Sequence, residues 1–432
     1  MRQWDDRRLH GEEQSGHRQL QQPLHEEGCL FNLPDCFRHL LEHVRLRRNS
    51  DHGMSKVEWS QRSSPRPPWQ RRPTPFALVI LGVTFAVACG TPKEDPSRLV
   101  YLRTPVPARD SLQSEVLGPA DLIANPWMIG SNGRIVVVSD LKPPYLHVLD
   151  ARTGRHIKSF GAHGEGPGDF SGAPSLMRAG LQADTLWMLD GPRRRITGFA
   201  IAALESDTMA PRATTFQIDS VLAYTADGPG RSGLIVAMAQ DWKEGLIPLR
   251  LHLGSPRADL GPPRSFSDSR FTPRYFGNAY LGRLCYSPKH QVTVQIFTFA
   301  GRIDLLDSTG VMTGSVAVPY PFRPDPYADT TAGKQIDFNP FGERVRWAYY
   351  DCAATDRFLY AIYDGRMVGG KAPNPVPVSE VQVFDWTGRV LRTVVLDHAS
   401  TGVSVPPGDS LLYSFAEDSG RFAVRRTRLR QR

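Results

Sequence analysis

Six short apolar runs recur along the chain, and this repetition restricts the fold more than any other feature of the sequence. They begin 49 to 66 residues apart: IVVVSD at 135, TLWMLD at 185, LIVAMAQD at 234, VTVQIFTF at 292, FLYAIYDG at 358 and LLYSFAED at 411. Each has the length of a strand and is rich in β-branched or aromatic residues. Their nearly continuous apolar character is typical of strands buried on both faces. The sequence therefore predicts a β unit that occurs six times.

A second strand-like run follows each of the six. These second runs are YLHVLD at 145, ITGFAI at 196, PLRLHL at 248, RIDLLD at 302, EVQVFD at 380 and FAVRRTRL at 422. Three of them lead into one kind of turn, which is DARTG from Asp150, DSTG from Asp307 and DWTG from Asp385. In such a turn the aspartate can cap backbone N–H groups and the glycine can take a positive φ, so that a further antiparallel strand follows directly.

The six units predict an all-β fold, a six-bladed β-propeller over residues 98–430. A unit of three or four antiparallel strands cannot bury both of its faces alone, whereas six units arranged radially bury them against one another. A β-sandwich is the alternative, but six matched units fit poorly into two sheets. We expect RLVYLR at 98–103 to pair beside 421–429, so that an N-terminal strand closes the last blade.

The first 97 residues are expected to lie outside the propeller. Residues 1–53 are polar and lack periodicity, and we interpret them as an untranslated or disordered extension before Met54. Residues 54–88 have the pattern of an export signal, with an apolar run from Phe76 to Ala88 that is short for a membrane-spanning helix. The final AVAC is similar to a lipoprotein signal-peptidase site, which would make Cys89 the lipidated first residue of a tether over 89–97. A plain secretory peptide, with Cys89 incidental, is the alternative.

An acyl chain on Cys89 would hold the protein on a membrane of the bacterial cell envelope, on the periplasmic or outer-membrane side, without spanning it. Cys285 and Cys352 are the cysteines of the expected propeller. Export makes a disulfide between them possible, but two cysteines do not form a framework that requires one. The formal net charge of +8 is not clustered along the chain, so no nucleic-acid partner is expected.

The stretch FGAHGEGPGDF at 160–170 resembles the Gly-x-Gly-Pro-Gly-Glu/Asp-Phe signature of bacterial six-bladed propeller lipoproteins, which are related to NHL-type and TolB-type propellers. The segments YYDCAATDRFLYAIYDGR and VQVFDWTGRVL are similar to the later blades of that family. The resemblance spans roughly residues 98–430 and implies the fold, but no particular activity.

The same glycine-rich stretch could be a phosphate-binding loop or a turn between strands. A phosphate loop needs its glycines to lead into the N-terminus of a helix, with a Lys-Ser/Thr pair or a further glycine. DFSGAPSL follows instead. We therefore interpret Gly164, Gly166 and Gly168 as turn residues and Phe170 as the residue that re-enters the core.

Four aspartates follow the first apolar runs at equivalent positions, and we expect them to surround one mouth of the propeller channel. They are Asp140, Asp190, Asp241 and Asp364. Two interpretations are open. The carboxylates could line a polar or cation-binding ring, with a calcium ion at the channel mouth if they converge. Alternatively, each aspartate caps the tight turn after its strand.

Three long segments interrupt the repeat, at 254–279, 319–344 and 364–379. Long loops on a rigid scaffold are where binding residues tend to lie. The candidates for ligand contact are Arg270, Tyr275, Phe276, Tyr320, Phe322 and Tyr327. The alternative is that these aromatic residues fix the loops to the blades.

Two classes of function fit this sequence. The first is a binding or interaction module for a protein, peptide or glycan. The second is an enzyme, either a metal-assisted lactonase-like hydrolase or an NHL-type lyase. A catalytic set of residues is not traceable in the sequence, which favours the binding module.

Overall fold

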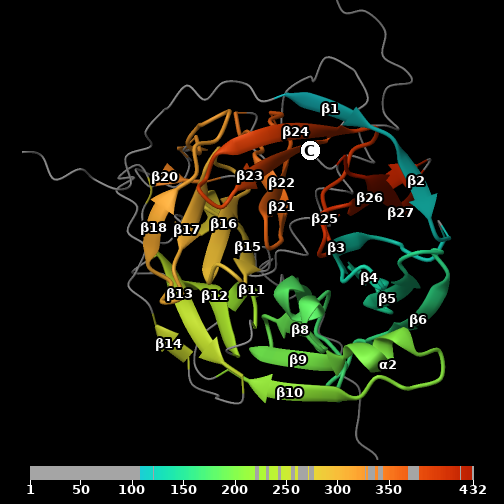
Figure 1. The fold of residues 1–432 in the computed structure, drawn as a ribbon. Helices are drawn as coiled ribbons and strands as arrows, with labels where there is room; N and C mark the ends of the chain where they lie inside the picture. Colours follow the sequence, from blue (N-terminus) through green and yellow to red (C-terminus); the bar gives the residue numbers. More distant parts are fainter. Residues whose placement is uncertain are drawn as a thin grey trace, which may run out of the picture.

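Six β-sheets stand around a common axis as the blades of a propeller (Figure 1). The computed structural model describes residues 108–430, apart from residues 120, 219–222, 230–232, 242–244, 254–257, 261–270, 272–276, 326, 329–335, 339–343, 368–378 and 419. The predicted six-bladed β-propeller is confirmed.

The first three blades are four-stranded antiparallel sheets. The first contains β3 (Pro126–Ser131), β4 (Ile135–Asp140), β5 (Leu146–Asp150) and β6 (His156–Phe160). The second contains β7 (Ser175–Met177), β8 (Thr185–Asp190), β9 (Arg195–Ala200) and β10 (Ala213–Gln217), with the short helices η2 (Arg178–Gln182) and α2 (Ile201–Glu205). The third contains β11 (Ala223–Asp227), β12 (Leu234–Asp241), β13 (Gly245–His252) and β14 (Ala258–Leu260).

The remaining blades follow the same plan, and two of them receive a strand from the N-terminal segment. The fourth contains β15 (Gly282–Ser287), β16 (Val292–Phe297), β17 (Ile303–Leu306) and β18 (Met312–Ser315). The fifth contains β21 (Tyr349–Ala354), β22 (Phe358–Tyr363), β23 (Glu380–Asp385) and β24 (Val390–Leu396), with β1 (Arg109–Leu112) at its edge. The sixth contains β25 (Val403–Ser404), β26 (Leu411–Asp418), β27 (Arg421–Arg428) and β2 (Ser114–Leu117). A separate hairpin joins β19 (Tyr327–Ala328) to β20 (Ile336–Asp337).

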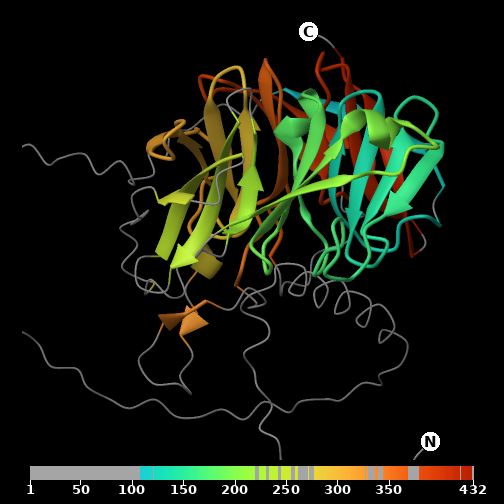
Figure 2. The same cartoon turned by 90° about the horizontal axis from the view of Figure 1, so that it is seen from below.

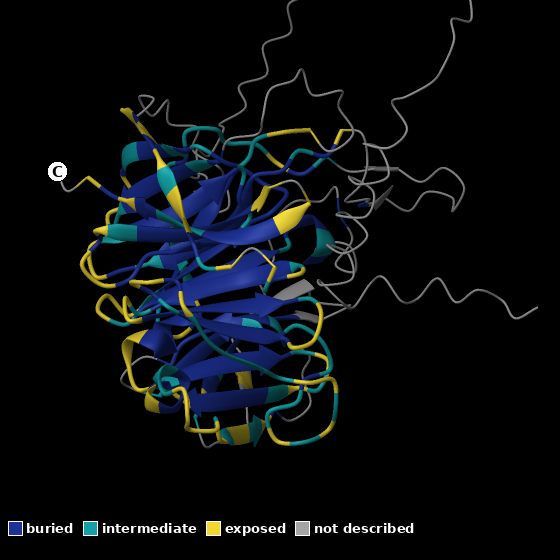
Figure 3. Ribbon diagram, turned by 90° about the vertical axis from the view of Figure 1, so that its right-hand side faces the viewer, coloured by how far each residue is buried: buried dark blue, intermediate teal, exposed yellow. Residues whose placement is uncertain are grey.

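The six apolar runs are the second strands of the six blades. β4, β8, β12, β16, β22 and β26 begin at the first residue of their runs, and their apolar positions are almost completely buried. Both faces of these strands pack against neighbouring blades, because side chains alternate across each sheet. Figure 3 shows this arrangement, with buried strands and exposed residues concentrated in the loops. The continuous apolar pattern of the runs thus has the physical cause that the sequence indicated.

The predicted turns between third and fourth strands are also confirmed. Asp150, Asp307 and Asp385 each accept a backbone N–H from the threonine two or three positions later, at 2.7, 2.7 and 3.0 Å. The glycine that ends each turn has a φ of +74°, +76° or +84°. These turns set the register of the outer strands.

The innermost strands form a closed ring about the axis. β3, β7, β11, β15, β21 and β25 contact one another in this order, and β25 contacts β3 again. Seen from the side, the blades stand together as one layer of strands (Figure 2). Every blade therefore presents its first strand to the axis.

An N-terminal strand closes the last blade, as expected, but a different segment from the predicted one does so. β2 pairs antiparallel with β27, from Ser114 opposite Thr427 to Leu117 opposite Val424. The expected segment, 98–103, lies outside the described residues, and β2 occupies the place beside 421–429 where we expected it. β1 pairs in parallel with β24, which adds a fifth strand to the neighbouring blade.

A buried polar network fixes this closure. The Asp397 carboxylate accepts the backbone N–H of Ser114 at 3.1 Å and its hydroxyl at 2.7 Å. Asp397 also lies 2.8 Å from Nδ1 of His398, whose Nε2 lies 2.9 Å from the Ser414 hydroxyl. The Arg425 guanidinium donates to Ser114 Oγ at 3.1 Å. The network therefore joins the end of β24, the middle of β26 and the first residue of β2.

This network stabilises the fold most at neutral to mildly alkaline pH. Burial lowers the pKa of His398, although Asp397 opposes that shift, so the folded protein favours the neutral imidazole. Burial raises the pKa of Asp397, but hydrogen bonds from Ser114 and His398 outweigh it and bring the pKa to about 2. A group with a lowered folded pKa stabilises the fold above its unfolded pKa and loses that contribution as the pH falls. The His398 contribution is thus present above about pH 6.5 and is lost below it.

We predict that His398→Asn lowers the unfolding midpoint at pH 8 and that its difference from wild type narrows at pH 5, because acid removes the contribution of the neutral imidazole from the wild type. Thermal unfolding at both pH values measures this. His252→Asn is the matched control, since His252 is exposed on β13. A His398→Asn difference that stays constant between pH 8 and pH 5 would contradict the assignment.

Candidate functional site

Charged side chains meet at the axis of the ring, where the first strands come together. We call Arg178, Arg283 and Asp351 the axial cluster. Arg178 is the first residue of η2, directly after β7, and the other two lie on β15 and β21. All three are buried, with 8%, 8% and 0% of their surface exposed. Burying three charged side chains away from water is unfavourable unless the charges are paired, so such a cluster has a structural or a functional role.

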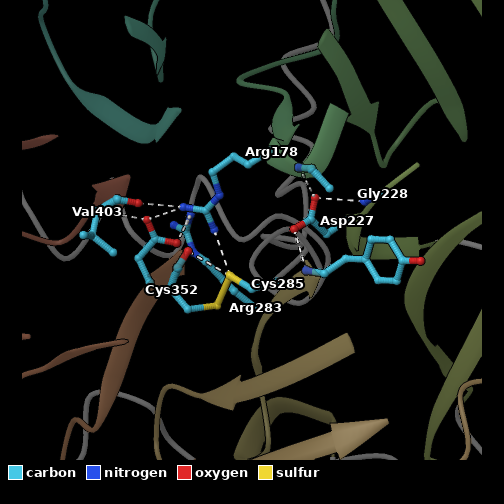
Figure 4. The surroundings of a disulfide bond; sticks show 10 residues. Arg178, Asp227, Gly228, Arg283, Cys285, Cys352 and Val403 are labelled. Carbon is cyan, nitrogen blue, oxygen red and sulfur yellow. Dashed lines mark hydrogen bonds and ion pairs between the residues drawn. A yellow bond between two sulfur atoms is a disulfide. The ribbon is translucent and has the colours of Figure 1, made fainter. Parts of the chain in front are cut away.

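Arg178 connects three blades through its guanidinium. Its Nη1 donates to Asp351 Oδ2 at 2.8 Å and to the carbonyl oxygen of Val403 at 3.0 Å. The backbone N–H of Val403 donates to the same carboxylate oxygen at 2.9 Å. Figure 4 shows Arg178 reaching across the axis toward Val403. The second, fifth and sixth blades therefore share one charged contact.

Arg283 is the less completely paired guanidinium. Its Nη2 donates to the carbonyl oxygen of Trp127 at 3.2 Å, and its guanidinium carbon lies 4.4 Å from the centre of a Trp127 ring. Its Nη1 is 3.7 Å from Asp351 Oδ1, which is an ion-pair distance but not a hydrogen bond. Burial lowers the pKa of Arg283 to about 10, with Asp351 raising it and Arg178 lowering it further.

A disulfide lies directly beside the cluster. Cys285 on β15 and Cys352 on β21 are bonded, with their Cα atoms 6.1 Å apart (Figure 4). The Arg178 Nη2 atom is 3.3 Å from the Cys285 sulfur. The bond joins the fourth and fifth blades two residues after Arg283 and one residue after Asp351. It settles the pairing that the sequence left open, and it holds the two strands that carry those side chains.

A fourth buried acidic side chain, Asp227 at the end of β11, accepts hydrogen bonds from the backbone. Its carboxylate accepts the N–H groups of Ala179 at 3.1 Å, Gly228 at 2.8 Å and Tyr286 at 2.9 Å. Burial raises its pKa, although Arg178 and these three hydrogen bonds oppose the shift. Asp227 therefore fixes the chain after β7 to the neighbouring blades, and among the described residues it forms no ion pair within 4 Å of either arginine.

β-Bulges shape the same end of the first strands. The register shifts at the second residue of β3, β11 and β21, and this residue is aromatic in each case: Trp127, Tyr224 and Tyr350. A bulge re-aims the extra side chain and is common at the rims of β structures. The bulged residue is thus aromatic at equivalent positions in three first strands, and the ring of Trp127 lies against the Arg283 guanidinium of the axial cluster.

The strand pairing places two of the predicted aspartates relative to this cluster. Pro126, which precedes Trp127, pairs with Asp140, and Tyr349 pairs with the residue before Asp364. The predicted aspartates thus lie at the end of the blades where Trp127 and Asp351 enter. The residues of the cluster themselves were not predicted.

The contacts of the predicted aspartates agree with turn capping. Asp140 is 1% exposed and accepts backbone N–H groups from Ala124 at 2.7 Å, Asn125 at 3.1 Å and Lys142 at 2.9 Å. It thereby fixes the segment that enters β3. In the first blade the Asp140 carboxylate therefore holds the backbone in place.

Asp190 has the same role in the second blade, where its carboxylate accepts the backbone N–H of Ser171 at 2.9 Å and the Ser171 hydroxyl. Asp364 accepts from Arg366 Nε at 2.5 Å. Asp241 ends β12, and its side chain lies outside the described residues. Within the part of the chain that the structure describes, no three His, Cys, Asp or Glu side chains gather to hold a metal ion. The calcium ion stays a prediction.

Two of the predicted aromatic contacts pack against the blades. Tyr320 stacks on Tyr363 with ring centres 5.1 Å apart, and the Arg346 guanidinium lies 4.9 Å from the centre of the Phe322 ring. These contacts fix the loop after β18 to the fifth blade, as the alternative interpretation expected. Arg270, Tyr275 and Phe276 lie outside the described residues, and of Tyr327 only its place in β19 is described.

The glycine-rich stretch is a turn between the first and second blades. Phe170 is fully buried, and its N–H donates to the carbonyl oxygen of Ala162 at 2.9 Å. A Cβ on Gly164 would lie 2.6 Å from the Asp169 carboxylate, which would have to move, and Gly168 has a φ of +88°, a conformation that favours glycine. Strand β7 follows at Ser175 rather than a helix. This agrees with the turn interpretation and not with a phosphate loop.

The axial cluster was missed because its residues occur singly. Each lies in a short apolar segment that precedes one of the six recognised runs: SLMRAGL, GRLCYS and YYDCAA. An isolated charge in the first strand of a blade is the signal that could have found them, since that strand faces the axis.

Comparison with known proteins finds similarity only to solved structures. No protein-family model matches the chain, and no curated protein matches it. Among solved structures, a DUF4221-family member from Bacteroides vulgatus is 13% identical with a TM-score of 0.49, covering 77% of this chain and 100% of that one. A Bacteroides fragilis protein inferred to be exported is 11% identical with a TM-score of 0.46, covering 75% and 100%. A streptogramin B lyase is 10% identical with a TM-score of 0.41, covering 73% and 97%.

We predict that Asp351→Asn destabilises the protein by about 3–5 kcal/mol, because it leaves two buried guanidiniums without a balancing charge. Chemical denaturation measures the difference. Asp121→Asn is the matched control, since Asp121 pairs with Arg421 where both side chains are more than half exposed, and it should cost less than about 1 kcal/mol. Equal losses in the two variants would show that the axial charges are not coupled.

Proposed function

We propose that this protein is an exported binding module, held on a membrane of the bacterial envelope through a lipid on Cys89, which takes a small polar ligand at the axial cluster. The described helices include none that is long and apolar enough to cross a bilayer.

One observation carries the ligand part of this proposal. Arg178 Nε, Arg283 Nη1 and Asp351 Oδ1 are buried polar atoms that have no hydrogen-bond partner in the described structure. Leaving such atoms unpaired costs about 1–3 kcal/mol each, and more when they are charged. Native proteins satisfy nearly all buried polar groups, so three unsatisfied atoms in one cluster indicate a missing partner.

Two features support the envelope location. The segment 54–88 has the basic, apolar and small-residue order of an export signal, and AVAC ends it. The disulfide between Cys285 and Cys352 adds an independent argument, because structural disulfides persist in oxidising compartments and are rare in the cytosol.

The ligand part is tested by thermal unfolding of the purified protein against a panel of small organic acids, amines, neutral sugars and divalent cations. We expect at least one class to raise the midpoint saturably, and we expect the effect to be lost in Arg283→Gln but kept in Arg421→Gln, an exposed control. A panel without any saturable effect would refute a binding site at the cluster. A midpoint that falls after EDTA treatment would instead favour the metal-dependent hydrolase.

The anchor is tested by metabolic labelling with a palmitate analogue. We predict that Cys89→Ala abolishes labelling and moves the protein from the membrane to the soluble envelope fraction, because one residue carries the acyl chains. Thr91→Ala is the control, since Thr91 lies in the same expected tether and leaves Cys89 in place. Unlabelled wild-type protein would indicate the plain secretory alternative.

A further inference from the structure

We infer that the ligand of the axial cluster is an anion that offers a carboxylate group to Arg178 and Arg283. This inference rests on the proposed function and specifies its chemistry. The argument starts from charge. Two guanidiniums face one paired carboxylate, that of Asp351, which lies 2.8 Å from Arg178 and 3.7 Å from Arg283.

No other described acid forms an ion pair with either guanidinium, although Asp227 interacts electrostatically with Arg178 at longer range. Among the described residues, the ion pairs of Arg178 and Arg283 go to Asp351 alone. The nearby Asp227 carboxylate accepts three backbone N–H groups instead. A buried charge without a counter-charge is strongly unfavourable in a folded protein, so the cluster favours a bound negative charge.

The unpartnered atoms specify where that charge would bind. Arg178 Nε and Arg283 Nη1 are donors without a hydrogen-bond acceptor, on side chains only 9% and 10% exposed, and the third unpartnered atom, Asp351 Oδ1, lies 3.7 Å from Arg283 Nη1. A guanidinium cannot accept a hydrogen bond or lose its proton at ordinary pH, so only an acceptor satisfies it. The chemistry of both donors thus calls for oxygen atoms of an anion, which form shorter and stronger bonds than a neutral acceptor does.

A carboxylate fits the donor pair, Arg178 Nε and Arg283 Nη1, better than a neutral group does. Its two oxygens provide one acceptor for each of the two unpartnered donors, which lie on different guanidiniums. The Trp127 ring, 4.4 Å from the Arg283 guanidinium carbon, covers one face of that guanidinium and leaves its edge as the polar side. The disulfide holds together β15 and β21, which carry Arg283 and Asp351, and the hydrogen bonds to Asp351 and Val403 hold Arg178, so the donors are positioned before any ligand arrives.

The carboxylate could belong to a free organic acid or to the C-terminus of a peptide. The experiment therefore has two ligand arms, sodium acetate and a short peptide with a free C-terminus, each with a neutral isostere, acetamide or the amidated peptide. Binding is followed by calorimetry and by the unfolding midpoint, in sodium chloride of the same ionic strength, so that general salt effects cancel.

We expect saturable stabilisation by at least one carboxylate, of roughly 5 °C at a hundred times its Kd, and none by its neutral isostere. Arg283→Gln should weaken binding by at least about tenfold, because it removes a charge-assisted hydrogen bond. Arg421→Gln should bind as wild type does. The acetamide and amidated-peptide comparisons use wild-type protein, so they remain decisive if Arg283→Gln fails to fold.

Two outcomes would overturn the inference. One is equal binding of a carboxylate and its amide, and the other is unchanged carboxylate affinity in a folded Arg283→Gln. If the wider panel finds a neutral or cationic ligand while carboxylates fail, the proposed binding function stands and its assigned chemistry is wrong. If nothing binds, both are wrong.

Discussion

The whole ring depends on the backbone ladder between β2 and β27. A propeller is a closed circle of sheets, and this circle is closed by four residue pairs that join residues about 310 positions apart in the chain. Without them the sixth blade would lack its outer strand. The Asp397–His398 network secures this ladder through Ser114, so a few buried hydrogen bonds connect the first described strands to the last ones. Closing so long a loop costs conformational entropy, which the packing between six blades must offset.

The repeat predicted the architecture because its signal comes from burial. β4, β8, β12, β16, β22 and β26 each lie between two neighbouring blades, so nearly every residue is apolar and the pattern is visible in the sequence. The closing strands have no such signal. β1 and β2 read RDSL and SEVL, and they alternate or expose their side chains at the edge of a blade. RLVYLR is the more strand-like segment by composition, but pairing at an edge depends on backbone hydrogen bonds that composition does not encode.

The sequence predicted a set of recurring aspartates, but it did not predict the axial cluster. Aspartates at the ends of second strands are visible because they recur, and recurrence also follows from the need to cap backbone N–H groups. Asp140 and Asp190 have that capping role. Arg178, Arg283 and Asp351 occur once each, in η2 after β7, in β15 and in β21, and only the closed ring brings them together. Their proximity is a property of the sixfold arrangement and not of any one blade.

The parallel pairing of β1 with β24 has a mechanical consequence. Any pull on the chain before Arg109 reaches β1 first, along the strand axis. The four pairs from Arg109 opposite Thr393 to Leu112 opposite Leu396 then carry the tension together, in shear, instead of opening one at a time. β2, which closes the ring by pairing with β27, follows β1 in the chain. Tension on the N-terminal segment is therefore resisted by the β1–β24 pairing before it reaches β2 in the sixth blade.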